Sequence, residues 1–297
     1  MANFDEYMRV RREQVDAWLD GYLPPEDTPP GEIHRAMRYS IFAGGKRLRP
    51  ILALAAGEVF NAPEDWLKPV CCALEMIHTY SLIHDDLPAM DNDEMRRGQP
   101  TCHKVFGEAI AILAGDALLT RAFQTLAQAS SDPLFLQRQS QLIAEIAMAA
   151  GTEQGMIAGQ VMDMLAEGSP IDATALERLH RAKTGALIKV SVRAGGLLGD
   201  ANELELQRLT AYAEAIGLAF QIVDDILDLT ATRAQLGKTP GKDMKVGKAT
   251  YPAFYGLQQS RQLAHQLVDG AVAEITYLHR DVTRLEQLAR YIIERIS

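Results

Sequence analysis

Two short stretches of the sequence concentrate carboxylates at a spacing that suits chemistry. The first is DDLPAMD at residues 85–91, and the second is DDILD at residues 224–228. Each stands at the end of a strongly apolar run, where unpaired carboxylates are costly to place. We therefore expect both stretches to meet cations.

The second stretch has the spacing of a metal site on a helix. Asp224 and Asp228 are four residues apart and share one helix face, with Asp225 about 100° around the axis. Oxygen donors in this arrangement suit Mg²⁺, which takes one or two carboxylates and leaves its other positions to water and phosphate. A solvated helix end is the alternative for one such triplet, and the presence of two triplets favours metal binding.

The first stretch needs an interrupted helix. On a continuous helix Asp85 and Asp91 would point about 120° apart. Pro88 disrupts the helical ladder between them and can turn Asp91 back toward Asp85 and Asp86. We expect a metal site at a frayed helix end.

Basic residues that could bind anions accompany the carboxylates. The stretch GGKRLRP at residues 44–50 places two glycines before three cations, and Arg96 and Arg97 follow the first aspartates. Lys183 lies in an apolar helical segment, where a lysine needs an anion or a polar cavity. A helix end with a solvated basic tail is the alternative for the glycine-lysine stretch alone, and the spacing of a Walker loop is absent. Together, the cations and carboxylates suggest two or more diphosphate groups held partly through Mg²⁺.

The elements that must position these residues are predicted to be helices. Apolar residues recur at spacings of three and four, and no Asn-Gly or Asp-Gly turn separates alternating runs. We predict an all-α fold with a short helix at 4–20, a helix start near Gly31 and another at Leu134 after Ser-Ser-Asp-Pro. Long helices that form a central bundle are expected at 65–87, 104–128, 173–198 and 203–229.

The chain is predicted to form one domain over residues 1–297, because no linker or fixed-period repeat divides it. One stretch, Gln235 to Lys248, is too poor in apolar groups to pack into a core. We expect it to be a mobile loop.

Composition argues against several classes of partner. The 39 Asp and Glu residues outnumber the 30 Lys and Arg residues, and a net charge of -9 opposes binding to nucleic acid. No uncharged apolar run approaches the ~18 residues of a membrane span, and the charged N-terminal residues do not resemble a signal peptide. We expect a cytoplasmic protein whose Cys71, Cys72 and Cys102 are reduced and buried.

The motifs of the chain resemble those of the trans-isoprenyl diphosphate synthases, and within that family the short-chain bacterial branch that makes farnesyl diphosphate. The resemblance extends from residue 44 to residue 243 and rests on six motifs in the family's order. They are GGKRLRP, DDLPAMDNDEMRRG, GMIAGQVMD, KTGALI, FQIVDDILD and GKTPGKD. The resemblance implies an isoprenoid synthase fold, a single bundle of about ten or more helices around a central cavity, and a homodimer.

This family resemblance implies a sequential head-to-tail condensation. Dimethylallyl diphosphate and isopentenyl diphosphate give geranyl diphosphate, and a second isopentenyl unit gives farnesyl diphosphate with release of diphosphate. The allylic diphosphate would bind through Mg²⁺, as three ions that Mn²⁺ could replace. The implied metal ligands are Asp85, Asp86, Asp91 and Asp224, with Asp225 and Asp228 in support.

The resemblance also assigns roles to the remaining site residues. Arg96, Lys183 and Lys238 would stabilise the departing diphosphate, and Thr184 and Gln221 would line the cation site with oxygen dipoles. Isopentenyl diphosphate would bind at Gly45, Lys46, Arg49, His78 and Arg97. Gln160 and Asp163 would support the site, and His84 and His103 are expected to be packed or supporting residues.

Product length is expected to depend on residues just before the first aspartates. On a regular helix Tyr80 and Ser81 lie roughly 6 to 7.5 Å before Asp85 along the axis, in the direction a prenyl tail would grow. The resemblance supports this, because an aromatic residue five positions before the motif is typical of farnesyl-producing members. Tyr80 could also be an ordinary core tyrosine, and mutation rather than burial distinguishes the two.

Three other functions stay open at this point. A synthase of the same fold could stop at geranyl, geranylgeranyl or a longer diphosphate. A terpene cyclase shares the architecture but carries an Asn/Asp-Ser/Thr-Glu triad where this chain has DDILD. A noncatalytic synthase subunit would be expected to have lost one acidic motif, and both motifs are present.

Overall fold

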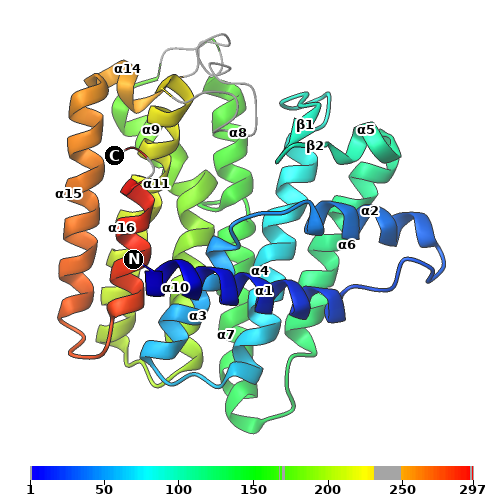
Figure 1. The fold of residues 1–297 in the computed structure, drawn as a ribbon, viewed down its shortest axis with the longest axis horizontal. Helices are drawn as coiled ribbons and strands as arrows, with labels where there is room; N and C mark the ends of the chain where they lie inside the picture. Colours follow the sequence, from blue (N-terminus) through cyan, green and yellow to red (C-terminus); the bar gives the residue numbers. More distant parts are fainter. Residues whose placement is uncertain (1, 167, 169–170, 231–248, 295, 297) are drawn as a thin grey trace. The chain divides into compact units, whose positions relative to one another are not determined.

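The computed structural model describes residues 2–166, 168, 171–230, 249–294 and 296. Within these residues the secondary structure is almost entirely helical (Figure 1), which confirms the predicted all-α fold. By its internal contacts the chain divides into two compact units, Met1–Leu54 with Pro63–Ile143 and Ala55–Ala62 with Ala144–Ser297. The single domain over residues 1–297 stays a prediction, and each unit is described by itself. The predicted loop Gln235 to Lys248, with Lys238, lies outside the described residues.

The first unit contains the N-terminal helices and a short hairpin. Its elements are α1 (Ala2–Tyr22), α2 (Gly31–Phe42), the start of α3 (Leu48–Val59), α4 (Glu64–Asp85), β1 (Met95–Arg96), β2 (Gln99–Pro100), α5 (Cys102–Phe106), α6 (Glu108–Ala127) and the start of α7 (Pro133–Ala150). The predicted helix starts near Gly31 and Leu134 are confirmed. At the second of these, Asp132 Oδ1 accepts a hydrogen bond from the Leu134 amide at 2.8 Å, as a capping side chain does.

Helices α4 and α6 lie side by side and form the main packing of this unit (Figure 1). They approach closely at Gly115, where an added Cβ would lie 2.1 Å from His84 Nε2. That nitrogen lies 3.0 Å from the Ile112 carbonyl oxygen of α6. His84 is therefore a packed residue, as expected, and it fixes the end of α4 where the first aspartates begin.

Helix α6 is, within the described residues, the one helix long and apolar enough to cross a membrane by length and composition. The same test is passed by core helices of other proteins, and α6 carries Glu108, Asp116 and Arg121. Its inner side packs against α2, α4 and α5. The three cysteines are free and buried, as predicted.

The second unit is built around the long helix α11. Its elements are the end of α3, the end of α7, α8 (Met156–Ala166), α9 (Ala173–His180), the π-helical turn η1 (Arg181–Gly185), α10 (Ala186–Leu198), α11 (Glu203–Thr230), α14 (Tyr251–Tyr255), α15 (Leu257–Thr276) and α16 (Thr283–Glu294). Helix α11 packs against α15, α10 and α16 (Figure 1). The helix predicted at 203–229 is confirmed, whereas the one predicted at 173–198 is interrupted by η1.

Two features of the first unit depart from the predicted pattern. The segment 104–128 is two helices rather than one, because Gly107 adopts a positive φ of 81° between α5 and α6. Strands β1 and β2 form a small antiparallel hairpin whose turn is Arg97-Gly98, with φ of 53° and 79°. Positive φ at both central residues is typical of the tightest hairpin turns. The turn contains neither Asn-Gly nor Asp-Gly, and it was not predicted because a left-handed arginine is uncommon.

One of the three cations of GGKRLRP lies in the core of the first unit. The side chain of Arg47 is fully buried, and its Nε donates to Asp16 Oδ1 at 2.7 Å. Its Nη1 donates to Glu75 Oε1 at 2.8 Å and its Nη2 to the Ile41 carbonyl oxygen at 2.6 Å. Arg47 therefore joins α1, α2 and α4 and is not available to bind an anion.

We predict that Arg47→Met destabilises the protein by about 3 to 5 kcal/mol, because it leaves the buried Glu75 without its cation. Urea denaturation followed by circular dichroism measures the change. The matched control is Arg9→Met, which removes an exposed arginine paired with Glu6 and Glu13 and should leave the midpoint nearly unchanged. Equal midpoints for the two variants would contradict the structural role of Arg47.

Candidate functional site

The first aspartate stretch begins where α4 ends. After Asp85 the chain turns back, so that the Asp91 amide donates to the Asp85 carbonyl oxygen at 2.8 Å and the Asp93 amide to the Asp86 carbonyl oxygen at 3.2 Å. This is the reversal predicted from Pro88. It brings the backbone of Asp91 beside that of Asp85 at the end of the helix.

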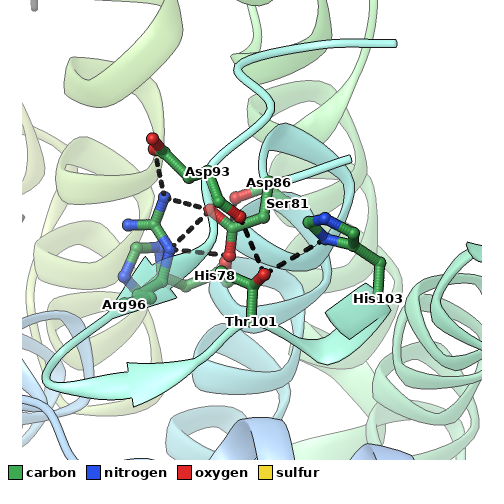
Figure 2. Close-up of polar contacts among 7 residues, drawn as sticks. All are labelled: His78, Ser81, Asp86, Asp93, Arg96, Thr101 and His103. Carbon is green, nitrogen blue, oxygen red and sulfur yellow. Dashed lines mark hydrogen bonds and ion pairs between the residues drawn. The ribbon is translucent and has the colours of Figure 1, made fainter. Parts of the chain in front are cut away.

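Asp86 is engaged by an arginine of the hairpin (Figure 2). Its carboxylate is buried, and Arg96 Nε lies 2.9 Å from both of its oxygens while Nη2 lies 2.6 Å from Oδ1. Burial raises the pKa of Asp86, and the guanidinium counteracts this rise. Arg96 Nη2 also lies 3.9 Å from Asp93 Oδ2. In this structure the predicted ligand Asp86 and the predicted diphosphate contact Arg96 are therefore partners of each other.

The hairpin that carries Arg96 and Arg97 is closed by Thr101. The Thr101 amide donates to the Glu94 carbonyl oxygen at 3.0 Å, and Thr101 Oγ1 donates to the Asp93 carbonyl oxygen at 2.7 Å. The same hydroxyl lies 3.2 Å from His103 Nδ1 (Figure 2). His103 is buried, as expected for a packed or supporting residue.

A cluster of cations surrounds His78 on α4. Burial lowers the pKa of His78 well below its ordinary value, and Arg49, Arg97 and Arg96 lower it further. His78 is therefore neutral at physiological pH and offers hydrogen bonds rather than charge. Guanidinium groups around a neutral imidazole can bind a phosphate or diphosphate.

Gly45 lets Arg97 approach the glycine-rich stretch. Gly45 has a φ of 139°, and an added Cβ would lie 2.5 Å from Arg97 Nη1. Arg97 Nη1 donates to the Gly44 carbonyl oxygen. Arg97 is thus in contact with the glycine-rich stretch, Arg49 and Arg97 act electrostatically on His78, and Lys46 is exposed.

Tyr80 lies inside the first unit, one turn before His84. Its side chain is 5% exposed, and its hydroxyl has no hydrogen-bond partner among the described residues. Burial, with a contribution from Asp85, raises the pKa of Tyr80 to about 12. The neighbouring Ser81 donates from Oγ to the His78 carbonyl oxygen at 2.8 Å (Figure 2). A neutral, unpartnered hydroxyl on a buried ring does not have the ordinary environment of a core tyrosine.

In the second unit, four polar residues form a stripe on α11. They are Gln221, Asp224, Asp225 and Asp228. Gln221 Oε1 accepts a hydrogen bond from Thr184 Oγ1 of η1, so the two predicted dipole residues are in contact. Asp225 and Asp228 are buried, at 6% and 5% exposure, and neither oxygen of Asp228 has a hydrogen-bond partner among the described residues.

Lys183 of η1 pairs with the GQVMD helix α8. Its Nζ lies 2.6 Å from Asp163 Oδ2, and both side chains are partly buried. Gly159 allows this approach, because an added Cβ would lie 2.1 Å from the Lys183 amide nitrogen. π-Helical turns are frequent at functional sites. Asp163, predicted to support the site, is therefore in direct contact with Lys183.

The carboxylates fit Mg²⁺ by the chemistry of their oxygens rather than by a preformed coordination site. Across the described ranges, no group of three or more His, Cys, Asp or Glu side chains is arranged to hold a metal. Asp228 nevertheless presents two buried oxygens without a partner in these ranges. Burying such a carboxylate is costly unless a cation meets it. Hard oxygen donors of this kind match Mg²⁺, so the residues fit the ion.

Two residues near the second aspartate stretch were not singled out by sequence reasoning. His180 Nε2 and the Tyr251 amide both contact Asp225 Oδ2, at 3.4 Å and 2.9 Å. Neither residue belongs to a motif with a known spacing, and both come from distant parts of the sequence. A histidine three residues before Lys183 in an apolar segment is the signal that could have identified the first of them.

Comparison with known proteins identifies the family of this chain. The model of the polyprenyl synthetase family matches residues 30–286. A farnesyl diphosphate synthase of Escherichia coli is 50% identical over 99% of this chain and 99% of its own, and a geranylgeranyl diphosphate synthase of Cyanophora paradoxa is 45% identical over 99% and 97%. The solved structure of an FPP/GFPP synthase from Zymomonas mobilis has a TM-score of 0.86 and 39% identity over 98% of this chain and 99% of that one. The chain belongs to the polyprenyl synthetase family, the prenyltransferases of isoprenoid biosynthesis.

Proposed function

We propose that the chain is a farnesyl diphosphate synthase, which joins isopentenyl diphosphate first to dimethylallyl diphosphate and then to geranyl diphosphate. The observation that carries the farnesyl assignment is Tyr80, a buried aromatic residue five positions before Asp85. Its ring would stop a growing prenyl chain at fifteen carbons. The similarity to the farnesyl diphosphate synthase of Escherichia coli supports the same product.

In this proposal, the allylic diphosphate would bind through Mg²⁺ at aspartate carboxylates. The proposed ligands are Asp85, Asp86, Asp91 and Asp224, and Asp225 and Asp228 would support the site beside them. Bound Mg²⁺ would neutralise the diphosphate and make it a better leaving group. Arg96, Lys183 and Lys238 would add positive charge to the departing oxygens, so that the carbon–oxygen bond ionises more easily.

Isopentenyl diphosphate would bind at the cluster around His78. Arg49, Arg97 and Lys46 would contact its phosphate oxygens, and neutral His78 would add a hydrogen bond. This binding would orient the alkene toward the allylic carbon.

The contact of Thr184 with Gln221 supports a role for both residues in stabilising positive charge. Their oxygen dipoles would offset the charge that develops on the allylic carbon during ionisation.

The proposal includes a cytoplasmic homodimer. Exposed apolar residues of α6, Ile112 and Leu113, offer surface for association, at 44% and 53% exposure. Light scattering on the purified chain tests this part of the proposal.

A geranylgeranyl diphosphate synthase is the second candidate, favoured by the 45% identity to the enzyme of Cyanophora paradoxa. The deciding experiment is product analysis after incubation with isopentenyl diphosphate, each allylic primer and Mg²⁺. A fifteen-carbon alcohol after dephosphorylation supports the farnesyl assignment. A twenty-carbon main product would replace it.

We predict that Asp85→Ala and Asp224→Ala each lower kcat at least about 100-fold, because each removes a charge that helps to hold the diphosphate. Excess chelator should abolish turnover of the wild type. The helical circular dichroism of both variants should match that of the wild type. Near-normal turnover in either variant, or turnover in chelator, would contradict the carboxylate-metal mechanism.

Asp228→Asn should change stability and activity in opposite directions. Replacing a buried carboxylate that has no hydrogen-bond partner among the described residues with a neutral amide should raise the melting temperature of the metal-free enzyme. The same change should weaken Mg²⁺-dependent turnover. Calorimetric melting without Mg²⁺ and a rate assay with it test the two parts, and a lower metal-free melting temperature would show that Asp228 is compensated.

Tyr80→Ala should shift the main product from fifteen to twenty carbons, because it opens space for one more isoprene unit. Ser81→Phe should shorten the product toward ten carbons. Chromatography of the dephosphorylated products measures both shifts. An unchanged fifteen-carbon product from a folded, active Tyr80→Ala enzyme would mean that other residues limit chain length.

A further inference from the structure

The middle aspartate of DDILD has a different environment from the last one. Asp225 Oδ2 accepts a hydrogen bond from the Tyr251 amide at 2.9 Å and lies 3.4 Å from His180 Nε2. Neither oxygen of Asp228 has a hydrogen-bond partner among the described residues. Asp225 and Asp228 lie three positions apart on one helix and have different environments.

Three elements of the second unit meet at Asp225. Helices α9, α11 and α14 contact one another, and each contributes one residue, His180, Asp225 and Tyr251. The three residues are 5% to 6% exposed. The rings of His180 and Tyr251 are stacked, with centroids 5.7 Å apart and planes 19° apart. His180 thus makes a polar contact with Asp225 and an aromatic contact with Tyr251.

Oδ2 of Asp225 is buried and already has two partners. It is therefore suited to holding the backbone of a neighbouring helix in place. The Tyr251 amide is at the start of α14, and the Thr250 side chain does not cap this helix end. Asp225 supplies an acceptor there in its place. Buried amides need such an acceptor, so loss of the contact would be costly.

The contacts of Asp225 also affect the position of Lys183, the predicted diphosphate contact. His180 is the last residue of α9, and η1 follows without a break, so Lys183 lies three residues further along the same helical run. Asp225 directly follows Asp224 on α11. The His180–Asp225 contact therefore joins the turn that carries Lys183 to the helix that carries the second aspartate stretch.

We propose that His180 is a positioning residue of the diphosphate site and that Asp225 is its anchor rather than a metal ligand. His180 holds the Asp225 carboxylate and stacks on Tyr251, and this fixes Lys183 relative to Asp224. The inference rests on the proposed function, since that function assigns Lys183 and Asp224 to the diphosphate. The alternative is that His180 is an ordinary core histidine whose only role is packing.

Two substitutions separate the polar contact of His180 from its packing. His180→Phe keeps a ring that can stack on Tyr251 and removes the nitrogen that contacts Asp225. His180→Gln removes the ring and keeps an N–H donor at a similar distance from the backbone. The matched control is Tyr212→Phe, which removes another buried hydrogen bond of the second unit, from the Tyr212 hydroxyl to the Leu285 carbonyl oxygen at 2.7 Å.

The measurement is calorimetric titration of each purified protein with inorganic diphosphate in the presence of Mg²⁺. We expect His180→Phe to weaken binding about 10- to 100-fold, the usual effect of losing a residue that orients a binding group. His180→Gln should stay within a few-fold of the wild type, and Tyr212→Phe should melt at a lower temperature without a change in affinity. Wild-type affinity in His180→Phe, or equal losses in the Phe and Gln variants, would overturn the inference.

A second pair of variants tests the anchor role of Asp225. Asp225→Asn keeps an oxygen that can accept from the Tyr251 amide, so it should weaken diphosphate binding far less than Asp224→Asn does. Hydrogen exchange of the Tyr251 amide, measured without Mg²⁺ or diphosphate, should be faster in His180→Phe than in the wild type. Equal losses in the two Asn variants would show that Asp225 is a ligand, and unchanged exchange would show that His180 does not support the anchor.

These readouts separate the inference from the proposed function. Failure of the wild-type chain to form any prenyl product would defeat the proposed function. The exchange rate of the Tyr251 amide and the diphosphate titrations would still decide the role of His180. The KM for isopentenyl diphosphate should be unchanged in His180→Phe, because that substrate is assigned to the cluster around His78.

Discussion

Burying charge among apolar helices is costly, and this cost determines how the chain arranges its polar residues. A charged group withdrawn from water loses several kcal/mol of hydration unless a well-placed partner compensates. In the first unit, buried Arg47 meets Glu75, and buried Asp86 meets Arg96. The ends of helices and the hairpin are placed where these partners can reach one another.

The same constraint makes the unpartnered groups informative. Asp228 and Tyr80 are both buried, and among the described residues neither has a hydrogen-bond partner for its terminal oxygens. Stability alone does not explain such groups, because a leucine or phenylalanine would cost less at either position. Their chemistry fits the two things that a prenyl diphosphate synthase must accommodate, a metal-bound diphosphate and an apolar tail. The proposed function would therefore account for residues that packing disfavours.

Sequence reasoning predicts the local features and misses the long-range ones. Helix periodicity predicts most elements, and Pro88 predicts the turn that brings Asp91 back to Asp85. The residue pattern does not show that Arg47 enters the core, because its cationic neighbours in GGKRLRP have the same chemistry. The left-handed φ of 51° that Arg47 adopts is a property of the folded backbone. The contact of His180 with Asp225 is equally hidden, since 45 residues separate the two. Local spacing carries no information about which distant element will supply a partner.

The π-helical turn at Arg181–Gly185 has a consequence for how this chain can change over time. A π turn holds one residue more than the α turn that it replaces. The wide turn absorbs this residue, so α9 and α10 keep nearly the relative rotation of one continuous helix, whereas a second inserted residue in α-helical form would rotate everything before the turn by about 100° relative to α10. His180 would then face away from α11 while every side chain of the motif was retained. In this part of the protein, the number of residues between two side chains matters as much as their identity.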